Sequence, residues 1–277
     1  MRAAKKPSRS PLAKVQASVK ALSRKPLFNS SNARFDCVAR GDDTTEINIY
    51  KEIGGWFGVN AEEFREMLDG ITSSNIVVNI NSPGGDVFDG IAIYNDLLAH
   101  KAYVVVRVTG LAASAASIIA LAGDRVEIAE NAFFMIHNAW SVAVGDARVM
   151  SARANLLKKI DAGLADTYAT RTGGDVDDIK QQMDDETWLT AAEAIEQGFA
   201  DATIDTDESE EADARAAFDL SPFKNVPKAL TPRRMAKSKA KEEPEKLPLP
   251  KEAEDFSSLV AAINDTSRSL AALISNP

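Results

Sequence analysis

Residues 76–86 read IVVNINSPGGD and carry the strongest structural signal in the chain. The stretch begins with consecutive branched apolar residues, which are typical of a strand buried on both faces of a parallel sheet. It ends in a Pro-Gly-Gly turn, and the helical pattern Gly90–Ala99 follows. A second apolar run, Tyr103–Thr109, leads in the same way into the helical stretch Ser114–Ala122. This strand–helix alternation predicts an α/β domain with a largely parallel sheet flanked by helices.

The same patterns locate the other elements of the domain. Further strands are expected at Ile47–Ile53, Arg125–Ile128 and Phe133–Ile136. Further helices are expected at Ala61–Leu68, Arg148–Arg171, Val176–Met183 and Ala191–Gln197. Apolar residues form a stripe along the longest of these helices: Met150, Ala154, Leu157, Leu164 and Tyr168. Thr190 and Glu193 have the spacing of a capping box at the start of the last one.

Charge divides the chain into three segments. Residues 1–40 carry ten Lys and Arg residues and a single acid, whereas residues 41–204 carry 26 acids and 11 basic residues. The sequence predicts a flexible basic leader over residues 1–44, a folded domain over 45–204 and a charged, proline-containing tail over 205–277 with a short helix near its end. The basic arm either contacts nucleic acid or is simply a solvated leader, and both interpretations stay open.

Composition excludes several classes of protein. Of the 277 residues, 45% are hydrophobic and 26% are charged, a balance typical of soluble globular proteins. The single cysteine, Cys37, excludes an intramolecular disulfide, and with two histidines in the chain a multi-histidine metal centre is excluded as well. No apolar run has the length of a membrane helix. We therefore expect a cytoplasmic protein that needs no metal.

Three short segments contain residues suited to catalysis. The paired glycines at 84–85 let the backbone approach a bound group closely, or they form a plain strand-to-helix connection. Ser114, in GLAASAAS at 110–117, is either a nucleophile near the positive end of a helix or a capping group. The next amide, that of Ala115, has no partner within such a helix and can donate to an oxyanion. His137 ends the apolar run FFMIH at 133–137, where it is either a general base or a structural residue.

Taken in order, these segments resemble the Clp protease proteolytic subunit (ClpP) family. The resemblance rests on Asn-Ser-Pro-Gly-Gly at 81–85, Gly-x-Ala-Ala-Ser at 110–114, Met-Ile-His at 135–137 and an acid before aromatic-Leu-Thr-Ala at 186–191. It covers Ile47–Ile204 and implies a ClpP/crotonase-like fold with repeated β-β-α units. Residues 52–54, 86–90 and 186–190 are most similar to the bacteriophage branch of head maturation, or prohead, proteases.

The resemblance implies a role for each matching residue. Ser114 is expected to be the nucleophile and His137 the base that activates it. The amides of Gly85 and Ala115 are expected to form the oxyanion hole. Glu186 matches the position of the acid best, and the neighbouring Asp185 is the second choice. No metal or cofactor is implied.

The implied function is that of a serine endopeptidase acting on polypeptides, with capsid or scaffold proteins as substrates in a phage. The long helix at 148–171 matches the element that joins rings in the family, so a ring-shaped homo-oligomer is expected, although its apolar stripe equally suits packing against its own sheet. Such a protein would act in the host cytoplasm or in an assembling procapsid, without membrane contact. Two alternatives remain: a crotonase-type hydratase or isomerase acting on acyl-coenzyme A, and a non-catalytic capsid assembly or scaffold protein.

Overall fold

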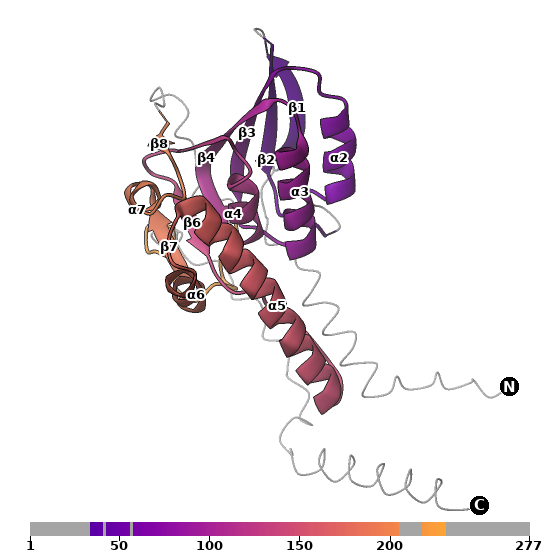
Figure 1. The fold of residues 1–277 in the computed structure, drawn as a ribbon, viewed down its shortest axis with the longest axis vertical. Coiled ribbons are helices and arrows are strands. Elements are labelled where there is room, and N and C mark those ends of the chain that lie inside the picture. The colour runs from indigo at the N-terminus through magenta and orange to yellow at the C-terminus, as the bar shows by residue number, and fades with distance from the viewer. Residues whose placement is uncertain (1–33, 41–42, 56–57, 205–217, 231–277) are drawn as a thin grey trace, which may run out of the picture. The chain divides into compact units, whose positions relative to one another are not determined.

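The computed structural model describes residues 34–40, 43–55, 58–204 and 218–230, and its strands and helices alternate along the chain (Figure 1). In order, the elements are β1 (Arg34–Arg40), β2 (Thr44–Tyr50), α2 (Ala61–Asp69), β3 (Asn75–Ser82), α3 (Val87–Ala99), β4 (Tyr103–Ala113), α4 (Ala115–Ala120), β5 (Arg125–Ile128), β6 (Phe133–Ile136), α5 (Ala147–Thr172), α6 (Val176–Asp184), β7 (Thr187–Thr190), α7 (Ala191–Glu196) and β8 (Ala202–Thr203). Every helix predicted between residues 61 and 197 is present, and α3 begins at Val87, earlier than expected, because the Asp86 carboxylate caps it.

The sheet is mixed but largely parallel, which confirms the predicted fold class. The main path runs β1-β2-β3-β4-β5-β8, in which β1 is antiparallel to β2 and the other neighbours are parallel. The β-β-α order occurs at β1-β2-α2 and at β5-β6-α5, whereas β3 and β4 are each followed directly by a helix. The hydrophobic core joins one face of this sheet to helices α2, α3 and α4 through side chains such as Ile47, Val78, Phe64, Ile93 and Ile119.

Strand β4 is longer than the sequence predicts, and this length shapes the molecule. Its residues Val105–Val108 pair with β5, and its last residues, Leu111–Ala113, pair with β6 instead. Strand β6 also pairs with β7 in antiparallel orientation. The connection expected at 110–113 is therefore strand, and through it β6 and β7 join the sheet as a branch beside β4.

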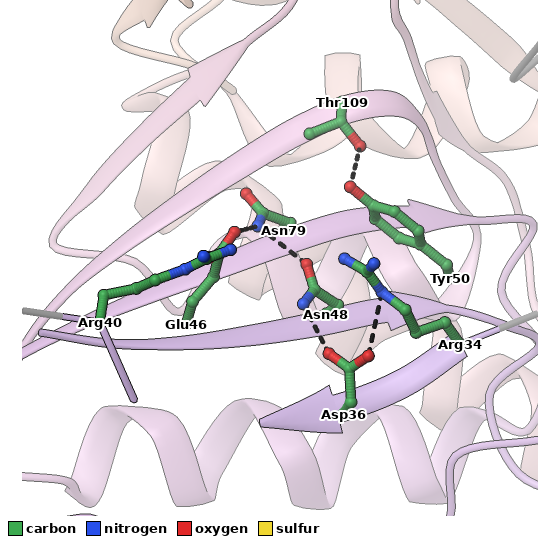
Figure 2. Close-up of polar contacts among 8 residues, drawn as sticks. All are labelled: Arg34, Asp36, Arg40, Glu46, Asn48, Tyr50, Asn79 and Thr109. Atoms are coloured by element: carbon green, nitrogen blue, oxygen red, sulfur yellow. Dashed lines mark hydrogen bonds and ion pairs between the residues drawn. The ribbon is translucent and has the colours of Figure 1, made fainter. Parts of the chain in front are cut away.

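Strands β3 and β4 were expected to be buried on both faces, but this prediction is wrong for one face. Val77 of β3 and Val105 of β4 are half-buried, and they share one face of the sheet. The same face also carries polar side chains. Figure 2 shows this polar row crossing β1, β2, β3 and β4. The apolar runs identify the face of the sheet that packs on the helices, whereas Asn48 and Asn79 lie on the opposite face.

The predicted leader is also shorter than expected, because residues 34–40 form β1. Phe35 stacks on Phe64 of α2, with the ring centroids 6.1 Å apart. The remainder of the leader lies outside the described residues, and so does the choice between a nucleic-acid contact and a solvated leader. Most of the tail and its predicted terminal helix lie outside them as well, but residues 218–230 pack against the domain.

A chain of hydrogen bonds holds β1 to the sheet (Figure 2). The Asn79 side-chain amide donates to Asn48 Oδ1 over 3.0 Å, and Asn48 Nδ2 donates to Asp36 Oδ1 of β1 over 2.6 Å. Asn48 is 1% exposed, so its amide depends on these partners. Arg40 and Glu46 form an ion pair near the other end of β1.

Helix α5 contacts the domain only with its second half. Its buried residues are Leu164, Ala165, Tyr168 and Ala169, whereas Met150 is 41% exposed. The predicted stripe is therefore packed at its C-terminal end and open to solvent at its N-terminal end. In the described part of the chain, no helix is long and apolar enough to cross a membrane.

The hydrogen-bond chain predicts that Asp36 matters for stability more than its exposed neighbour. Asp36→Ala leaves the buried Asn48 amide without its acceptor, and we expect a loss of about 1–3 kcal/mol in the free energy of unfolding. Arg34→Ala removes an ion pair with Asp36 whose side chains are 49% and 37% exposed, and should cost less than about 1 kcal/mol. Urea denaturation of both variants measures the difference; equal losses would contradict this account of β1.

Candidate active site

Ser114 stands at the junction of β4 and α4 in an unusual backbone conformation. Its φ of 55° and ψ of −125° lie outside the regions that a serine ordinarily adopts. Its side chain makes no capping hydrogen bond to α4, so the capping interpretation is wrong. Its amide donates to the carbonyl of Met135 on β6 over 3.0 Å. Such strain persists where surrounding structure imposes it, and it clusters at functional sites.

Gly84 makes this conformation possible by passing close to Ser114. A Cβ at Gly84 would lie 2.5 Å from the Ala113 carbonyl oxygen, 2.8 Å from the Ala115 nitrogen and 2.8 Å from Ser114 Cβ. Its φ of 87° also falls in the left-handed region that favours glycine. The Pro-Gly-Gly turn is therefore more than a connection, because it lets two backbone segments approach each other at Ser114.

His137 meets Ser114 because their strands end side by side. Ala113 of β4 is paired with Met135 of β6 in a parallel register. Ser114 follows Ala113 by one residue, and His137 follows Met135 by two. His137 Nε2 lies 2.7 Å from Ser114 Oγ, a hydrogen-bond distance. Burial lowers the pKa of His137, and the negative charge of Glu186 raises it by a smaller amount. The imidazole is therefore held neutral more readily than in water, as a proton acceptor requires.

The two amides singled out from the sequence belong to the residue after Gly84, which closely approaches Ser114, and to the residue after Ser114 itself. Gly85 and Ile53 form an isolated parallel β-bridge. Its hydrogen bonds are made by the residues on either side of Gly85: Ile53 N donates to Gly84 O over 2.8 Å, and Asp86 N donates to Ile53 O over 2.9 Å. In a parallel bridge of this kind the amide of the central residue points the other way. Ala115 is the first residue of α4, whose first-turn amides have no intrahelical partner. Among the described residues, neither amide has an acceptor.

Glu186, rather than Asp185, is the acid whose charge acts on His137. Ile136 and Thr187 are the end pair of the antiparallel β6–β7 ladder, so His137 and Glu186 lie just beyond this pair at the same end of the two strands, and no hydrogen bond joins their side chains. Glu186 is 9% exposed and adopts a φ of 51°. Asp185 instead ends α6, where its carboxylate accepts a hydrogen bond from Gln181.

The Glu186 carboxylate has partners that the sequence analysis missed. Its Oε1 accepts hydrogen bonds from the backbone amides of Lys224 and Asn225, each over 2.7 Å, and from Trp188 Nε1 over 3.3 Å. Two of these donors belong to the tail, which was predicted to lie outside the folded domain. The apolar residues scattered among its prolines, from Phe218 to Leu230, are a signal that it packs on the domain.

A second layer of contacts fixes the backbone around Ser114. The Ser117 hydroxyl donates to the Ser114 carbonyl over 2.6 Å and lies 2.7 Å from the Tyr168 hydroxyl of α5. Both side chains are buried, and burial raises the pKa of Tyr168. Within the described ranges, no group of three or more His, Cys, Asp and Glu side chains is arranged to hold a metal ion.

The close approach at Gly84 predicts a large difference between two glycine substitutions. Gly173→Ala adds a Cβ at a φ of 70° with nothing within 4 Å, so it should cost only the left-handed conformation, about 1–2 kcal/mol. Gly84→Ala should cost about 1–3 kcal/mol more, because its Cβ collides with backbone atoms. Urea denaturation measures the loss in the free energy of unfolding for each variant. Similar losses would show that the backbone around Gly84 can accommodate a Cβ.

The chain is similar to known proteins over the part that carries this site. The sequence model of the family described as Clp protease matches residues 65–207. The ATP-dependent Clp protease proteolytic subunit 1 of Protochlamydia amoebophila is 36% identical over 135 residues, 47% of this chain and 66% of that protein. Subunit 2 of Tropheryma whipplei is 33% identical over 129 residues, 46% of this chain and 72% of that protein.

Among solved structures, a point mutant of ClpP1 from Listeria monocytogenes matches with a TM-score of 0.52 and 26% identity, over 58% of this chain and 91% of that one. The match to the sequence relatives thus spans about two thirds of their length. Because the family's sequence model covers more than half of the chain, including Ser114, His137 and Glu186, the chain belongs to the Clp protease family.

Proposed function

We propose that this protein is a serine endopeptidase. The observation that carries the proposal is the 2.7 Å contact between Ser114 Oγ and His137 Nε2, made by a serine in a strained conformation and a half-buried imidazole. A nucleophile and its base within hydrogen-bond reach are the signature of covalent acyl transfer. Membership of the Clp protease family supports the same activity.

The proposed reaction begins when a peptide carbonyl binds beside Ser114. Ser114 Oγ attacks the carbonyl carbon while His137 Nε2 takes the hydroxyl proton, and the amides of Gly85 and Ala115 donate to the oxygen that becomes negative. The carbon–nitrogen bond then breaks, and His137 gives its proton to the leaving amine. Water, activated by His137 in the same way, attacks the acyl-enzyme and releases the acid product and free Ser114.

Glu186 is proposed as the third member of the triad. Its negative charge stabilises the imidazolium that forms when His137 takes the proton. The β6–β7 register supports Glu186 over Asp185, because Thr187, which follows Glu186, pairs with Ile136, which precedes His137. Glutamate is one methylene longer than aspartate and therefore reaches the imidazole with more freedom of rotation.

A ring-shaped homo-oligomer is part of the proposal. The first half of α5 is exposed, and the preceding loop presents Trp140, 63% exposed, together with Val142 and Val144, both 47% exposed. Apolar side chains gathered on a projecting helix and its adjoining loop are typical of a protein–protein interface. Their exposure in the single chain supports the expectation that α5 contacts another subunit.

The finer proposal is that the enzyme processes capsid or scaffold proteins during maturation of a phage head. It is supported by the similarity of residues 52–54, 86–90 and 186–190 to the phage branch of the family. Of these, Asp86 and Asp89 have visible tasks: Asp86 caps α3, and Asp89 accepts the Ala61 amide at the start of α2. Trimmed termini in the intact mass of the purified protein would show that its own tails are also substrates.

The proposed nucleophile and base predict selective labelling by a fluorophosphonate probe. Wild-type protein should gain one probe mass, Ser114→Ala should gain none, and His137→Ala should react at least about a thousandfold more slowly. Intact-mass spectrometry measures the addition. A verified oligomer that fails to react but binds acyl-coenzyme A would favour the hydratase alternative. Failure of both would favour a scaffold.

The proposed acid predicts a distinct pH profile for its variants. Labelling requires neutral His137, so its rate should fall as the pH drops through the pKa of His137, which burial places below the ordinary value of about 6.5. Glu186→Gln removes the charge that raises this pKa, so the fall should move to still lower pH while the maximal rate drops by about 10²–10⁴-fold. Asp185→Asn should change neither. The reverse pattern would assign the acid to Asp185.

A further inference from the structure

The tail returns to the domain through residues Phe218–Leu230, which we call the return segment; it is coloured orange in Figure 1. This segment follows the part of the chain that matches the family model, which ends at residue 207. Its side chains Phe223 and Leu230 are buried in a small apolar cluster with Leu111, Ala113 and Met135. These partners are the residues of β4 and β6 that lead into Ser114 and His137.

The return segment reaches the acid through its backbone. The amides of Lys224 and Asn225 both donate to Glu186 Oε1, and the Asn225 side chain donates to the Asp185 carbonyl over 2.6 Å. The Trp188 indole donates to the same carboxylate oxygen. Within the described residues, Glu186 Oε2 accepts no hydrogen bond, from His137 or from any other group.

The return segment also covers the histidine. The Phe223 ring meets the His137 ring edge-on, with centroids 5.5 Å apart, and it packs at 5.7 Å against the ring of Trp188. Because Phe223 is apolar and 9% exposed, it keeps water from one side of the imidazole.

We propose that the return segment is a positioning element of the active site: its Lys224 and Asn225 amides fix the Glu186 carboxylate beside His137, while Phe223 shields the imidazole from water. This inference rests on the proposed peptidase function and adds a part of the chain outside the family match. Two short hydrogen bonds to a carboxylate restrict its rotation. A glutamate, with its additional rotatable bond, benefits from this restriction more than an aspartate would.

The alternative that the segment blocks the site has a specific difficulty. The hydrogen bonds and ring contacts of residues 223–225 reach the acid and the base, and within the described residues none of them involves Ser114 Oγ or the amides of Gly85 and Ala115. The other charges near His137 are also accounted for: Asp184 accepts a hydrogen bond from the Asn138 side chain, and Asp161 accepts the Ala139 amide. The segment itself contributes Lys224, whose side chain is exposed.

Two substitutions at residue 224 test the amide contact. Lys224→Pro removes the donor to Glu186, whereas Lys224→Ala keeps it and changes only the exposed side chain. We expect Lys224→Pro to slow fluorophosphonate labelling by about tenfold or more and to lower the pKa of His137, since Glu186 is held less firmly beside it. Lys224→Ala should match wild type. Asn225→Ala, which keeps both amides and loses the bond to Asp185, should show a smaller change in the same direction.

Phe223→Ala predicts a pKa shift of the opposite sign. Opening the imidazole to water removes the main cause of its lowered pKa, so the pKa of His137 should rise and labelling should fail at a higher pH than in wild type. A segment with a merely structural role would leave the pKa of His137 unchanged in both variants. A segment that blocks the site would make both variants react faster than wild type. Either result overturns the proposal.

The titration of His137 can be read without any catalytic assay. The chain has two histidines, so NMR of protein with ¹³C-labelled histidine gives two signals, and His100→Gln assigns them. His100 serves as the internal control, because it lies at the end of α3 and its Nδ1 accepts the Ala102 amide. If wild type is not labelled by the probe, the proposed function fails, but opposite shifts of His137 in Lys224→Pro and Phe223→Ala would still support the return segment. Unshifted titrations would reject it.

Discussion

The continuous pairing of β4 with β6 is the constraint on which the rest of the site depends. Strand β4 stops pairing with β5 after Val108 and pairs its last three residues with β6, and the Ser114 amide extends this pairing to the Met135 carbonyl. Parallel strands in this register end at the same edge, so the side chains that follow them meet. The antiparallel β7 then brings Glu186 to the same edge from the opposite direction. The contact between Ser114 and His137 is therefore a consequence of strand register, and Gly84 supplies the space that the turn at Ser114 needs.

Local sequence patterns were enough to predict most of this framework. The apolar runs around Val78 and Val106 identified the central strands, and the capping box at Thr190 identified the last helix. The ordered motifs identified Ser114 and His137, which the structure brings together. The end of β4 was missed because Leu111–Ala113 consists of one leucine and two alanines, which suit a helix as well as a strand. Strand β1 was missed because its stability comes from Asn48 and Phe64, distant partners that the charged leader does not reveal.

The choice of the acidic residue shows most clearly what could not be predicted from the sequence. Asp184, Asp185 and Glu186 are consecutive, and spacing alone could only rank them. In the structure their environments diverge: Asp184 bonds to Asn138, Asp185 ends α6, and the charge of Glu186 acts on the histidine from a left-handed backbone conformation. Which of three adjacent carboxylates reaches an imidazole depends on where α6 stops and β7 begins, and that boundary depends on tertiary contacts. The return segment was beyond prediction for the same reason, because its prolines and charges hide a few apolar residues whose partners lie on β4 and β6.

The return segment brings two opposing influences to one imidazole. Shielding by Phe223 favours the neutral base, which is needed to take the proton from Ser114, and a fixed Glu186 favours the imidazolium, which exists only after that transfer. A buried histidine without a nearby anion would be neutral but costly to protonate, and a solvated histidine beside an anion would already be protonated over more of the pH range. Supplying both influences from one docked segment links them, because the backbone turn at residues 223–225 that seats the phenyl ring also aims the two amides at the carboxylate. In the proposed mechanism the packed segment thus contributes both influences on His137, although no side chain of that segment takes part in the proton transfers.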